Sequence, residues 1–267
     1  MSDCSTMGAD ELSSAVEVTD DLFLGGALRI RQPKTGYRAG LDAVLLAAVC
    51  PTRMDPARCL DCGAGAGVAG LAAARRIANL SVTLIERDPV LAAMAASNIA
   101  TNQLGDRCKI VQADLTRPLA EIAALALQAG QFDHVLANPP YHAHGRGTRA
   151  SDPLKDGSHA MAAGAFDEWA RFAAAMLRNG GSFTIIQRPD ALAEILAALT
   201  RRFGRVRILP LHGRTGKSAS RLLIQSIKGS RAGLEVLPGR VLHVADKHAF
   251  TEEFEEILRH GAPLTMT

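Results

Sequence analysis

The stretch Arg58–Arg76, "RCLDCGAGAGVAGLAAARR", decides the fold because it passes from a strand through a glycine-rich loop into a helix. Its first five residues predict a short strand, and the alanine-rich run from Val68 to Ala78 predicts a helix. The glycines between them let the backbone approach a ligand closely, which a side chain would prevent. In open parallel sheets, ligands bind at the carboxyl ends of the strands, where this loop lies.

The same alternation continues along the chain. Further strands are predicted at Val82–Glu86, Lys109–Gln112, Phe132–Ala137 and Ser182–Gln187, with helices at Pro89–Asn102, Leu119–Leu127, Phe166–Arg178 and Ala191–Arg202. The later runs "RVRILPLHG" and "SRLLIQSIKG" predict two strands joined by a short loop. Together these elements predict an α/β fold of Rossmann-like type: a mostly parallel seven-stranded sheet with helices on both faces and an antiparallel final strand pair.

The chain divides into four predicted parts around this core. Residues 1–18 are expected to form a flexible acidic tail, since residues 1–28 carry six acids and no base. Residues 19–56 read as a strand or hairpin followed by an apolar helix near Asp42–Cys50. The core is predicted at 57–230, and residues 231–267 are expected to add a hairpin and an acidic helix around Glu252–Arg259 that pack on the core.

Composition places the chain among ordinary globular proteins. Of its 267 residues 48% are apolar, which is enough for one large core. The longest apolar runs are too short to span a bilayer, and the first residues lack the basic and apolar regions of a signal peptide. Five cysteines without a regular framework fit a reducing compartment, so we expect a cytoplasmic protein. The Cys59-x-x-Cys62 pair lies in a strand and lacks a second ligand pair, so no metal site is predicted.

Acidic residues lie at or just after the carboxyl ends of the first three predicted core strands. Asp61 precedes the glycines Gly63, Gly65 and Gly67, Glu86 ends the second strand, and Asp114 follows the third. Gly65, Gly67 and Gly70 also satisfy the dinucleotide fingerprint G-x-G-x-x-G, with Glu86 about twenty residues on. Asp61 would serve a pyrophosphate poorly, but it would serve the ammonium of a methionine moiety well. The full set therefore favours S-adenosyl-L-methionine over a nicotinamide cofactor.

The fourth strand ends in "NPPY", Asn138 to Tyr141, which suits the methylation of a planar amine. The lone pair of such an amine is delocalised, and two fixed acceptors on its N–H groups would draw it back onto nitrogen. The Asn138 side chain and the Pro139 carbonyl can supply the pair, while Pro139 and Pro140 keep the turn rigid. Tyr141 offers a face on which a base can stack. The alternative is a plain turn that ends the strand.

These residues resemble a known family. The motifs "DCGAGAG" and "NPPY", with Glu86 and Asp114, look like class I methyltransferases, and "FLGGALRIRQPKTGYRAGLDAVLLAA" resembles the bacterial valine-tRNA adenine-N6 methyltransferases with a small methyltransferase domain. The resemblance implies transfer of a methyl group from S-adenosyl-L-methionine to the N6 amine of an adenine beside the anticodon. It further implies that Arg38 and Asp42 help to close the site, although the family's usual Lys-x-Gly-Thr-Asp is Arg38 to Asp42 here, without its Lys and Thr. The residues implied to hold the cofactor are Asp61, Gly63, Gly65, Gly67, Glu86, Asp114 and Asn138.

Related enzymes remain as alternatives, because release-factor glutamine methyltransferases also use N-P-P-Y and ribosomal guanine-N2 methyltransferases use a variant. Nine bases and no acid occupy residues 201–231, and Arg146 lies in the loop after "NPPY". A positive surface that includes Arg146, Arg214 and Lys217 would suit tRNA phosphates, whereas a protein substrate would not need it. A non-catalytic RNA-binding module is a further alternative. The sequence does not distinguish a monomer from a homodimer.

Overall fold

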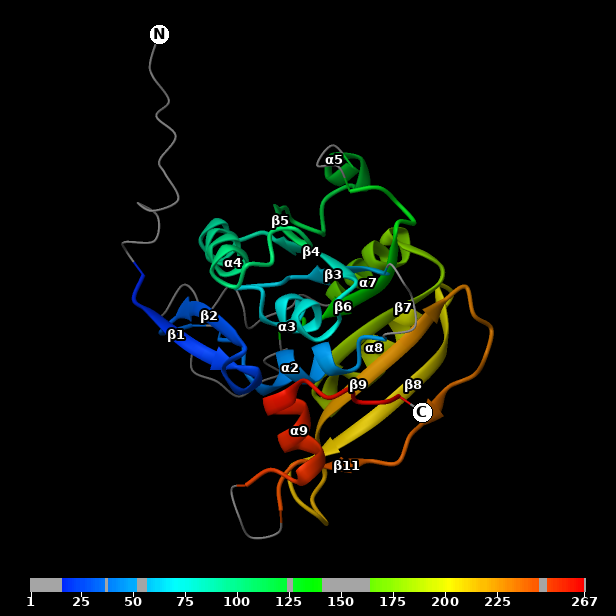
Figure 1. The fold of residues 1–267 in the computed structure, drawn as a ribbon. Coiled ribbons are helices and arrows are strands. Elements are labelled where there is room, and N and C mark those ends of the chain that lie inside the picture. The colour runs from blue at the N-terminus through cyan, green and yellow to red at the C-terminus, as the bar shows by residue number, and fades with distance from the viewer. Residues whose placement is uncertain are drawn as a thin grey trace.

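A central sheet organises the computed structural model, which describes residues 16–36, 38–51, 57–123, 127–140, 164–244 and 249–266 (Figure 1). Its seven main strands lie in the order β5-β4-β3-β6-β7-β9-β8. They are β3 (Ala57–Cys62), β4 (Leu80–Glu86), β5 (Cys108–Gln112), β6 (Phe132–Ala137), β7 (Leu177–Gln187), β8 (Phe203–His212) and β9 (Ala219–Lys228). This order puts the strand of the glycine loop, β3, in the interior of the sheet, between β4 and β6.

The strand directions confirm the predicted mixed sheet. Strands β3, β4, β5, β6 and β7 run parallel to one another, and β9 runs antiparallel to both β7 and β8. Two short strands, β10 (Glu235–Val236) and β11 (Arg240–Val241), add parallel to β8, so the described sheet has nine strands rather than the predicted seven. Each is two residues long, which is too short for an alternating pattern to appear in the sequence.

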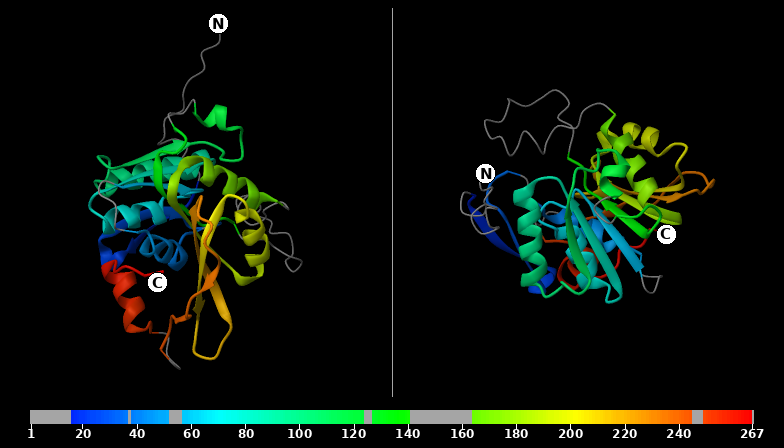
Figure 2. Two further views of the ribbon diagram at one scale, coloured as in Figure 1. Left: turned by 90° about the vertical axis from the view of Figure 1, so that its right-hand side faces the viewer. Right: turned by 90° about the horizontal axis from the view of Figure 1, so that it is seen from above.

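Helices cover both faces of the sheet (Figure 2). On one face lie α2 (Leu41–Ala48), α3 (Val68–Arg76) and α4 (Pro89–Thr101), and on the other lie α7 (Ala165–Met176) and α8 (Leu192–Leu199). Two hydrophobic clusters, one on each face, form the core. The remaining helical elements are the short α5 (Leu119–Ala123), the 3-10 turns η2 (Leu24–Gly26) and η3 (Pro189–Ala191), and the late helix α9 (Glu252–His260).

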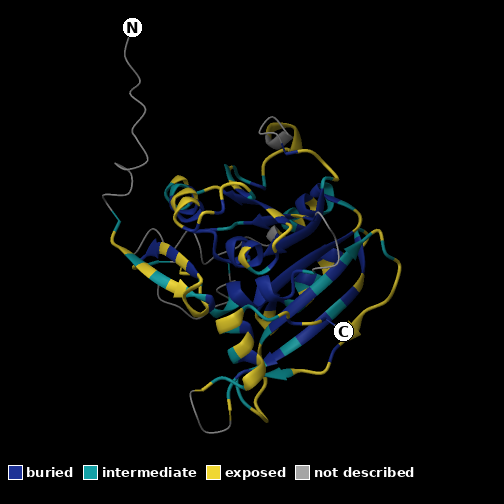
Figure 3. Ribbon diagram, viewed as in Figure 1, coloured by how far each residue is buried: buried dark blue, intermediate teal, exposed yellow. Residues whose placement is uncertain are grey.

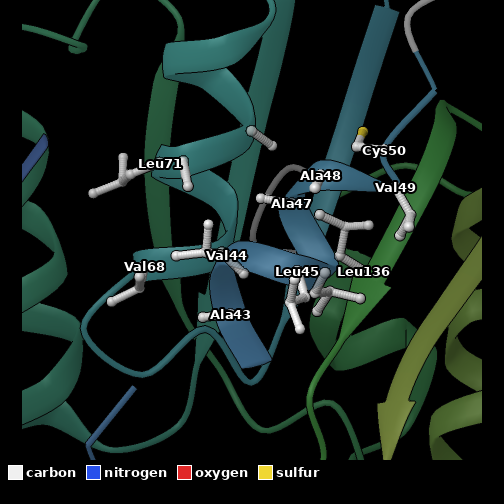
Figure 4. Close-up of a cluster of buried hydrophobic side chains, with 14 of the residues drawn as sticks. Ala43, Val44, Leu45, Ala47, Ala48, Val49, Cys50, Val68, Leu71 and Leu136 are labelled. Carbon is white, nitrogen blue, oxygen red and sulfur yellow. The ribbon is translucent and has the colours of Figure 1, made fainter. Parts of the chain in front are cut away.

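Helix α2 is the most deeply buried part of the segment that precedes the core. After Asp42 it carries only apolar side chains, and Ala43 to Ala48 are all buried. Figure 4 shows the labelled side chains of α2, among them Val44 and Leu45, between Val68 and Leu71 of α3 and Leu136 of β6. The burial colours of Figure 3 show the same contrast, with the central strands dark and the outer faces of β1 and α9 exposed. This packing fixes the position of Asp42, which lies in the first turn of α2.

A local sequence signal fixes the start of α4 but not the end of α7. Asp88 Oδ1 accepts hydrogen bonds from the backbone N–H groups of Val90 and Leu91, and Pro89 takes the first helical position of α4, as predicted. The helix predicted to reach Arg178 ends instead at Met176, because Leu177 is already extended and starts β7. Arg178 pairs with Asp133 of β6, and this contact holds the start of β7 in the sheet.

The N-terminal hairpin is held to the core by two asparagines. Strands β1 (Val18–Phe23) and β2 (Leu28–Pro33) pair antiparallel. The amide of Asn98 accepts from the N–H of Arg31 and donates to its carbonyl, and Asn102 one turn later does the same with Arg29. The expected tail of residues 1–18 therefore overlaps β1 at Val18, while residues 1–15 lie outside the described residues.

The C-terminal segment packs on the face of the sheet that carries α2 and α3. Helix α9 packs on α2 and η2, where its Phe254 and Ile257 are buried, and the N–H of Leu264 donates to the carbonyl of Ala48 at 3.0 Å. The hairpin expected in residues 231–267 is corrected in part. Strands β10 and β11 pair with β8 and not with each other, and the antiparallel pairing that the structure describes here is a single bridge between His243 and Phe250.

Candidate active site

Four predicted site residues meet at one edge of the sheet. Asp61 lies in β3, Glu86 ends β4, Asp114 follows β5 by two residues, and Asn138 directly follows β6. Because β6, β3, β4 and β5 are adjacent and parallel, their carboxyl ends lie side by side. The structure thus brings these residues together, although they are spread over 78 positions of the chain.

The glycine loop between β3 and α3 has a shape that only glycine accommodates. Gly63, Gly65 and Gly67 have φ angles of 62°, 57° and 91°. A Cβ on Gly63 would lie 2.5 Å from Cη2 of Trp169 in α7, and one on Gly67 would lie 2.8 Å from Cδ2 of Leu84. The loop is therefore fixed both by its own dihedral angles and by the side chains packed against it.

Glu86 links the glycine loop to the second strand. Its Oε2 accepts the backbone N–H of Gly65 at 2.8 Å, and its Oε1 accepts the N–H of Asp88 at 2.9 Å. An ionised carboxylate offers about four acceptor positions, so both oxygens retain capacity for the two hydroxyls of a ribose. Glu86 is consequently both part of the loop's support and a candidate ligand for the cofactor.

Asp61 is a buried carboxyl whose charge is costly. It is 2% exposed, and its Oδ2 accepts the backbone N–H of Gly70 at 2.7 Å. Burial raises the pKa of Asp61 to about 7, with a further contribution from the like charge of Glu86, while the Gly70 hydrogen bond opposes the shift. A bound cation would reverse this effect. Asp61 and Glu86 therefore fit the ammonium, the sulfonium and the ribose diol of S-adenosyl-L-methionine.

Asp114 lies at the same edge, after β5, the last strand on that side of the sheet. Burial acts to raise its pKa, but hydrogen bonds from the N–H and hydroxyl of Thr116, at 3.0 and 2.7 Å, together with Arg87 and Arg117, leave the pKa lowered. Its carboxylate is thus ionised at neutral pH and half-buried, as suits an acceptor for the adenine end of the cofactor.

The turn after β6 has one contact that the sequence did not predict. The side chain of Gln187, at the end of β7, is 1% exposed, and its Nε2 donates to the carbonyl oxygen of Pro139 at 3.0 Å. The only signal for it in the sequence is a polar residue at the end of an apolar strand. Tyr141 and Arg146 lie outside the described residues.

A family model described as the methyltransferase small domain matches residues 40–214, which include every one of these site residues. The chain belongs to this family. A solved structure of a "predicted O-methyltransferase" from Agrobacterium tumefaciens superimposes with a TM-score of 0.71 at 33% identity and covers 84% of this chain and 98% of the other. These two comparisons confirm the class I methyltransferase fold, and family membership supports S-adenosyl-L-methionine as the cofactor of this methyltransferase.

Curated relatives carry a more specific name. A tRNA1(Val) (adenine(37)-N6)-methyltransferase from Shewanella sp. (strain W3-18-1) is 36% identical over 110 residues, so this chain spans 44% of that relative's length. A protein of the same name from Flavobacterium johnsoniae is 25% identical over 232 residues, which are 86% of this chain and 94% of the relative. The family resemblance predicted from the motifs is thereby confirmed.

Two predicted closing residues of this methyltransferase have different surroundings. Arg38 donates to Asp21 Oδ2 at 2.7 Å and to Thr19 Oγ1 at 2.9 Å, so its guanidinium is bound to β1. Asp42 Oδ2 instead accepts from Nε of Arg221 at 2.7 Å. Arg221 precedes Leu222, which pairs with Gln187, so this ion pair lies at the edge of the sheet that carries the site. Arg221 was expected only as one of many bases.

The basic segment 201–231 of the methyltransferase does not form a single surface. Arg214 and Lys217 lie in the loop between β8 and β9. Gln187, at the site edge, pairs with Leu222 of β9, and β9 begins three residues before Leu222, at Ala219. The loop therefore lies more than about 10 Å beyond the site edge. Arg201, Arg205 and Arg231 lie at the opposite end of these strands. Three other bases form ion pairs: Arg202 with Asp167, Arg207 with Glu235 and Arg221 with Asp42.

The described residues contain neither a membrane-spanning helix nor a cluster of metal ligands. No described helix is long and apolar enough to cross a membrane. Within the same residues, no three His, Cys, Asp or Glu side chains are grouped so that they could hold a metal ion. The four cysteines described, at positions 50, 59, 62 and 108, are buried and unpaired as disulfides.

Proposed function

We propose that this protein transfers the methyl group of S-adenosyl-L-methionine to the exocyclic N6 amine of an adenine in tRNA, beside the anticodon of a valine tRNA. The observation that carries the proposal is the placement of Asn138 and Pro139 directly after β6, next to the strand that bears Asp61 and the glycine loop. An amine held by this turn would lie next to the cofactor that Asp61 and the glycine loop are proposed to hold.

The turn supplies acceptors for the two N–H groups of the target amine. The Asn138 side-chain oxygen accepts one hydrogen bond and the Pro139 carbonyl accepts the other, which draws the lone pair back onto nitrogen. Pro139 and Pro140 have no N–H to compete for these acceptors and restrict the backbone of the turn. The cofactor supplies an electrophilic methyl group on a sulfonium, so orientation for in-line attack is the main task of the protein.

The acids at the neighbouring strand ends hold the cofactor in this proposal. Asp61 pairs with its ammonium, Glu86 accepts from its ribose hydroxyls, and Asp114 accepts from its adenine amine. Gly63, Gly65 and Gly67 let the backbone lie against it. Asp61 must ionise to act in this way, and because burial raises its pKa to about 7, binding of a cation is coupled to release of a proton near neutral pH.

A tRNA substrate is supported by two observations. The relatives from Flavobacterium johnsoniae and Actinobacillus succinogenes, which match 86% of this chain, are named as tRNA1(Val) adenine-N6 methyltransferases. Arg214 and Lys217 lie in a loop that extends past the site edge, where they would meet phosphates on either side of an unstacked base. Tyr141 and Arg146 are proposed to stack on the base and to contact the backbone.

Other acceptors provide the alternatives. A release-factor glutamine or a guanine N2 presents a similar planar amine, and the Agrobacterium structure is named for O-methylation. The basic loop favours RNA over a protein amide. The paired acceptors favour nitrogen over a hydroxyl, because a hydroxyl has only one hydrogen to donate.

Mass spectrometry of nucleosides from the RNAs and of peptides from the release factor distinguishes these acceptors. The purified protein is incubated with S-adenosyl-L-methionine and, in parallel, with unmodified tRNA, ribosomal RNA and a release factor. We expect N6-methyladenosine in the tRNA, with fragmentation that places the methyl group on the base. A methyl group on ribose would identify an O-methyltransferase, and transfer only to the release factor would refute the tRNA proposal.

A further inference from the structure

The carbonyl of Pro139 is held by a side chain from the neighbouring strand. Ala137 of β6 pairs with Ile185 of β7, so Pro139 and Gln187 stand opposite each other two residues further on, where the two strands separate. The Nε2 of Gln187 donates to the Pro139 oxygen at 3.0 Å, and its Oε1 accepts the N–H of Arg188 at 2.9 Å. Both ends of the amide are thus used, which fixes its orientation.

This contact differs from routine satisfaction of a buried carbonyl in one respect. The Pro139 oxygen is the acceptor that the proposed function assigns to the target amine. A carbonyl oxygen has two lone pairs, so a hydrogen bond from Gln187 leaves one for the substrate and sets the direction in which it points. Gln187 is 1% exposed, and solvent therefore cannot replace its N–H if the side chain is lost.

We infer that Gln187 is a positioning residue for methyl transfer: its buried amide fixes the Pro139 carbonyl so that one lone pair faces the target amine. This inference rests on the proposed amine methylation. It assigns a role to a residue outside the N-P-P-Y motif. A side chain of β7 then helps to hold the acceptor pair rigid. The prolines fix φ at both positions, and Pro140 confines ψ of Pro139 to extended values; the Gln187 hydrogen bond narrows the direction of the Pro139 carbonyl further within that range.

The first test removes the amide. Gln187→Leu and the less branched Gln187→Met abolish the hydrogen bond while keeping an apolar side chain of similar size. Since a misdirected acceptor affects the reacting geometry and not the cofactor, we expect kcat to fall on the order of 100-fold, with the Kd for S-adenosyl-L-methionine unchanged. Cofactor titration by calorimetry also shows whether each variant is folded. If a variant that binds the cofactor like wild type keeps full kcat, the inference is wrong.

The second test follows the pH dependence of a variant with an ionisable side chain at position 187. In Gln187→Glu, a neutral carboxyl can donate to Pro139 and accept from Arg188, whereas a carboxylate cannot donate and would repel the carbonyl. Burial raises the pKa of such a carboxyl. We therefore expect the ratio of variant to wild-type kcat to fall with rising pH, by about tenfold per unit above that pKa. Division by the wild-type rate removes the titration of Asp61, which both proteins share.

Two cationic side chains lie near Gln187 along β7 and β9 among the described residues, and each is paired with an acid. They are Arg188, which pairs with Asp190 at 3.5 Å, and Arg221, which pairs with Asp42. Gln225 of β9 provides a matched control, because its Nε2 bonds to the Thr184 hydroxyl and not to the turn. We expect Gln225→Glu to show a flat activity ratio. A flat ratio for Gln187→Glu as well would refute the positioning role.

The assay separates this inference from the proposed function. Each variant is tested on tRNA, ribosomal RNA and a release factor, and compared on whichever acceptor the wild-type protein methylates. Transfer to a different amine with the Gln187 effects intact would refute the tRNA proposal and support the positioning role. Wild-type transfer without any Gln187 effect would overturn the positioning role alone. Wild-type protein that binds the cofactor but methylates none of them would overturn both.

Discussion

The backbone N–H of Gly65 donates to Oε2 of Glu86 at 2.8 Å, so the glycine loop after β3 is held by the last side chain of β4. The other oxygen of Glu86 accepts the N–H of Asp88. The residue that sequence patterns assign to a ribose is therefore also a structural support of the loop that lies against the cofactor. Replacement of its carboxylate should affect both roles together.

Glu86→Gln should weaken cofactor binding more than the loss of one ribose contact explains. The amide would present an NH₂ group to one of the two backbone donors, which leaves that donor unsatisfied. We expect the Kd for S-adenosyl-L-methionine to rise on the order of 100-fold by calorimetry, from about 1.5–3 kcal/mol for a charged hydrogen bond. Glu235→Gln, on β10 and paired with Arg207, is the control. Equal affinities of the Glu86 variant and wild type would contradict this role.

Asp61→Asn should stabilise the cofactor-free protein and abolish cofactor binding. The folded pKa of about 7 lies above the unfolded value of 3.8, so between them the folded state binds more protons and stability falls as pH rises. Asparagine can still accept the Gly70 N–H but carries no charge. The gain at pH 8 should be on the order of 4 kcal/mol at most and should vanish near pH 4.

Urea denaturation at pH 4 and pH 8 measures this effect in the absence of cofactor. Asp133→Asn is a control of opposite sign, because hydrogen bonds from Arg178 and Arg58 overcome the effect of burial and leave the pKa of Asp133 lowered. Its folded pKa is depressed, so its contribution is present above the unfolded pKa and is lost at low pH. An Asp61→Asn protein less stable than wild type at pH 8 would show that the buried charge is compensated.

Gly63→Ala should destabilise the protein through a contact with Trp169. Its φ of 62° is unfavourable for alanine, and the new Cβ would meet the indole at 2.5 Å. We expect a loss of about 1–3 kcal/mol in the free energy of unfolding. Gly105→Ala is the matched control, because a Cβ there meets nothing within 4 Å and its φ is not positive. Partial recovery in Gly63→Ala/Trp169→Leu would assign the loss to the indole, and no recovery would assign it to φ alone.

Charge reversal in the β8–β9 loop should weaken RNA binding. Arg214→Glu with Lys217→Glu removes two proposed phosphate contacts, so binding to tRNA should weaken and the slope of log K against log salt should become shallower by about 2. Arg201→Glu with Arg231→Glu makes the same change in net charge at the opposite end of the strands. Filter binding from 50 to 200 mM salt should separate the two pairs. Equal losses in both would indicate a general charge effect.

The sequence predicted those features that depend on neighbours along the chain. Local patterns predict the bounds of β6, the Asp88–Pro89 start of α4, the acid near the end of β3 and the acid that ends β4. Strand alternation then implied a parallel sheet, and a parallel sheet places those acids at one edge. This much of the site could be predicted because each of these residues is defined by its position near the end of a strand.

The contacts that tie the site together could not be predicted in this way. Gln187 with Pro139, Trp169 with Gly63 and Arg221 with Asp42 join residues 48, 106 and 179 positions apart. Each depends on strand order and register, which a single sequence does not specify. Arg38 is a different case. The family resemblance assigned it to the site, but nothing in the sequence indicated that it would pair with Asp21 of the hairpin.

Methyl transfer by Asn138→Ala tests the central claim most directly. The variant is incubated with S-adenosyl-L-methionine and unmodified tRNA, and N6-methyladenosine is quantified against wild type and against Asn179→Ala, at the exposed opposite end of β7. We predict loss of at least about 100-fold in N6-methyladenosine with cofactor affinity nearly retained, since the acceptor for the amine is removed while Asp61, Glu86 and Asp114 still hold the cofactor. Full transfer by Asn138→Ala, or no N6-methyladenosine from the wild-type protein, would contradict the account.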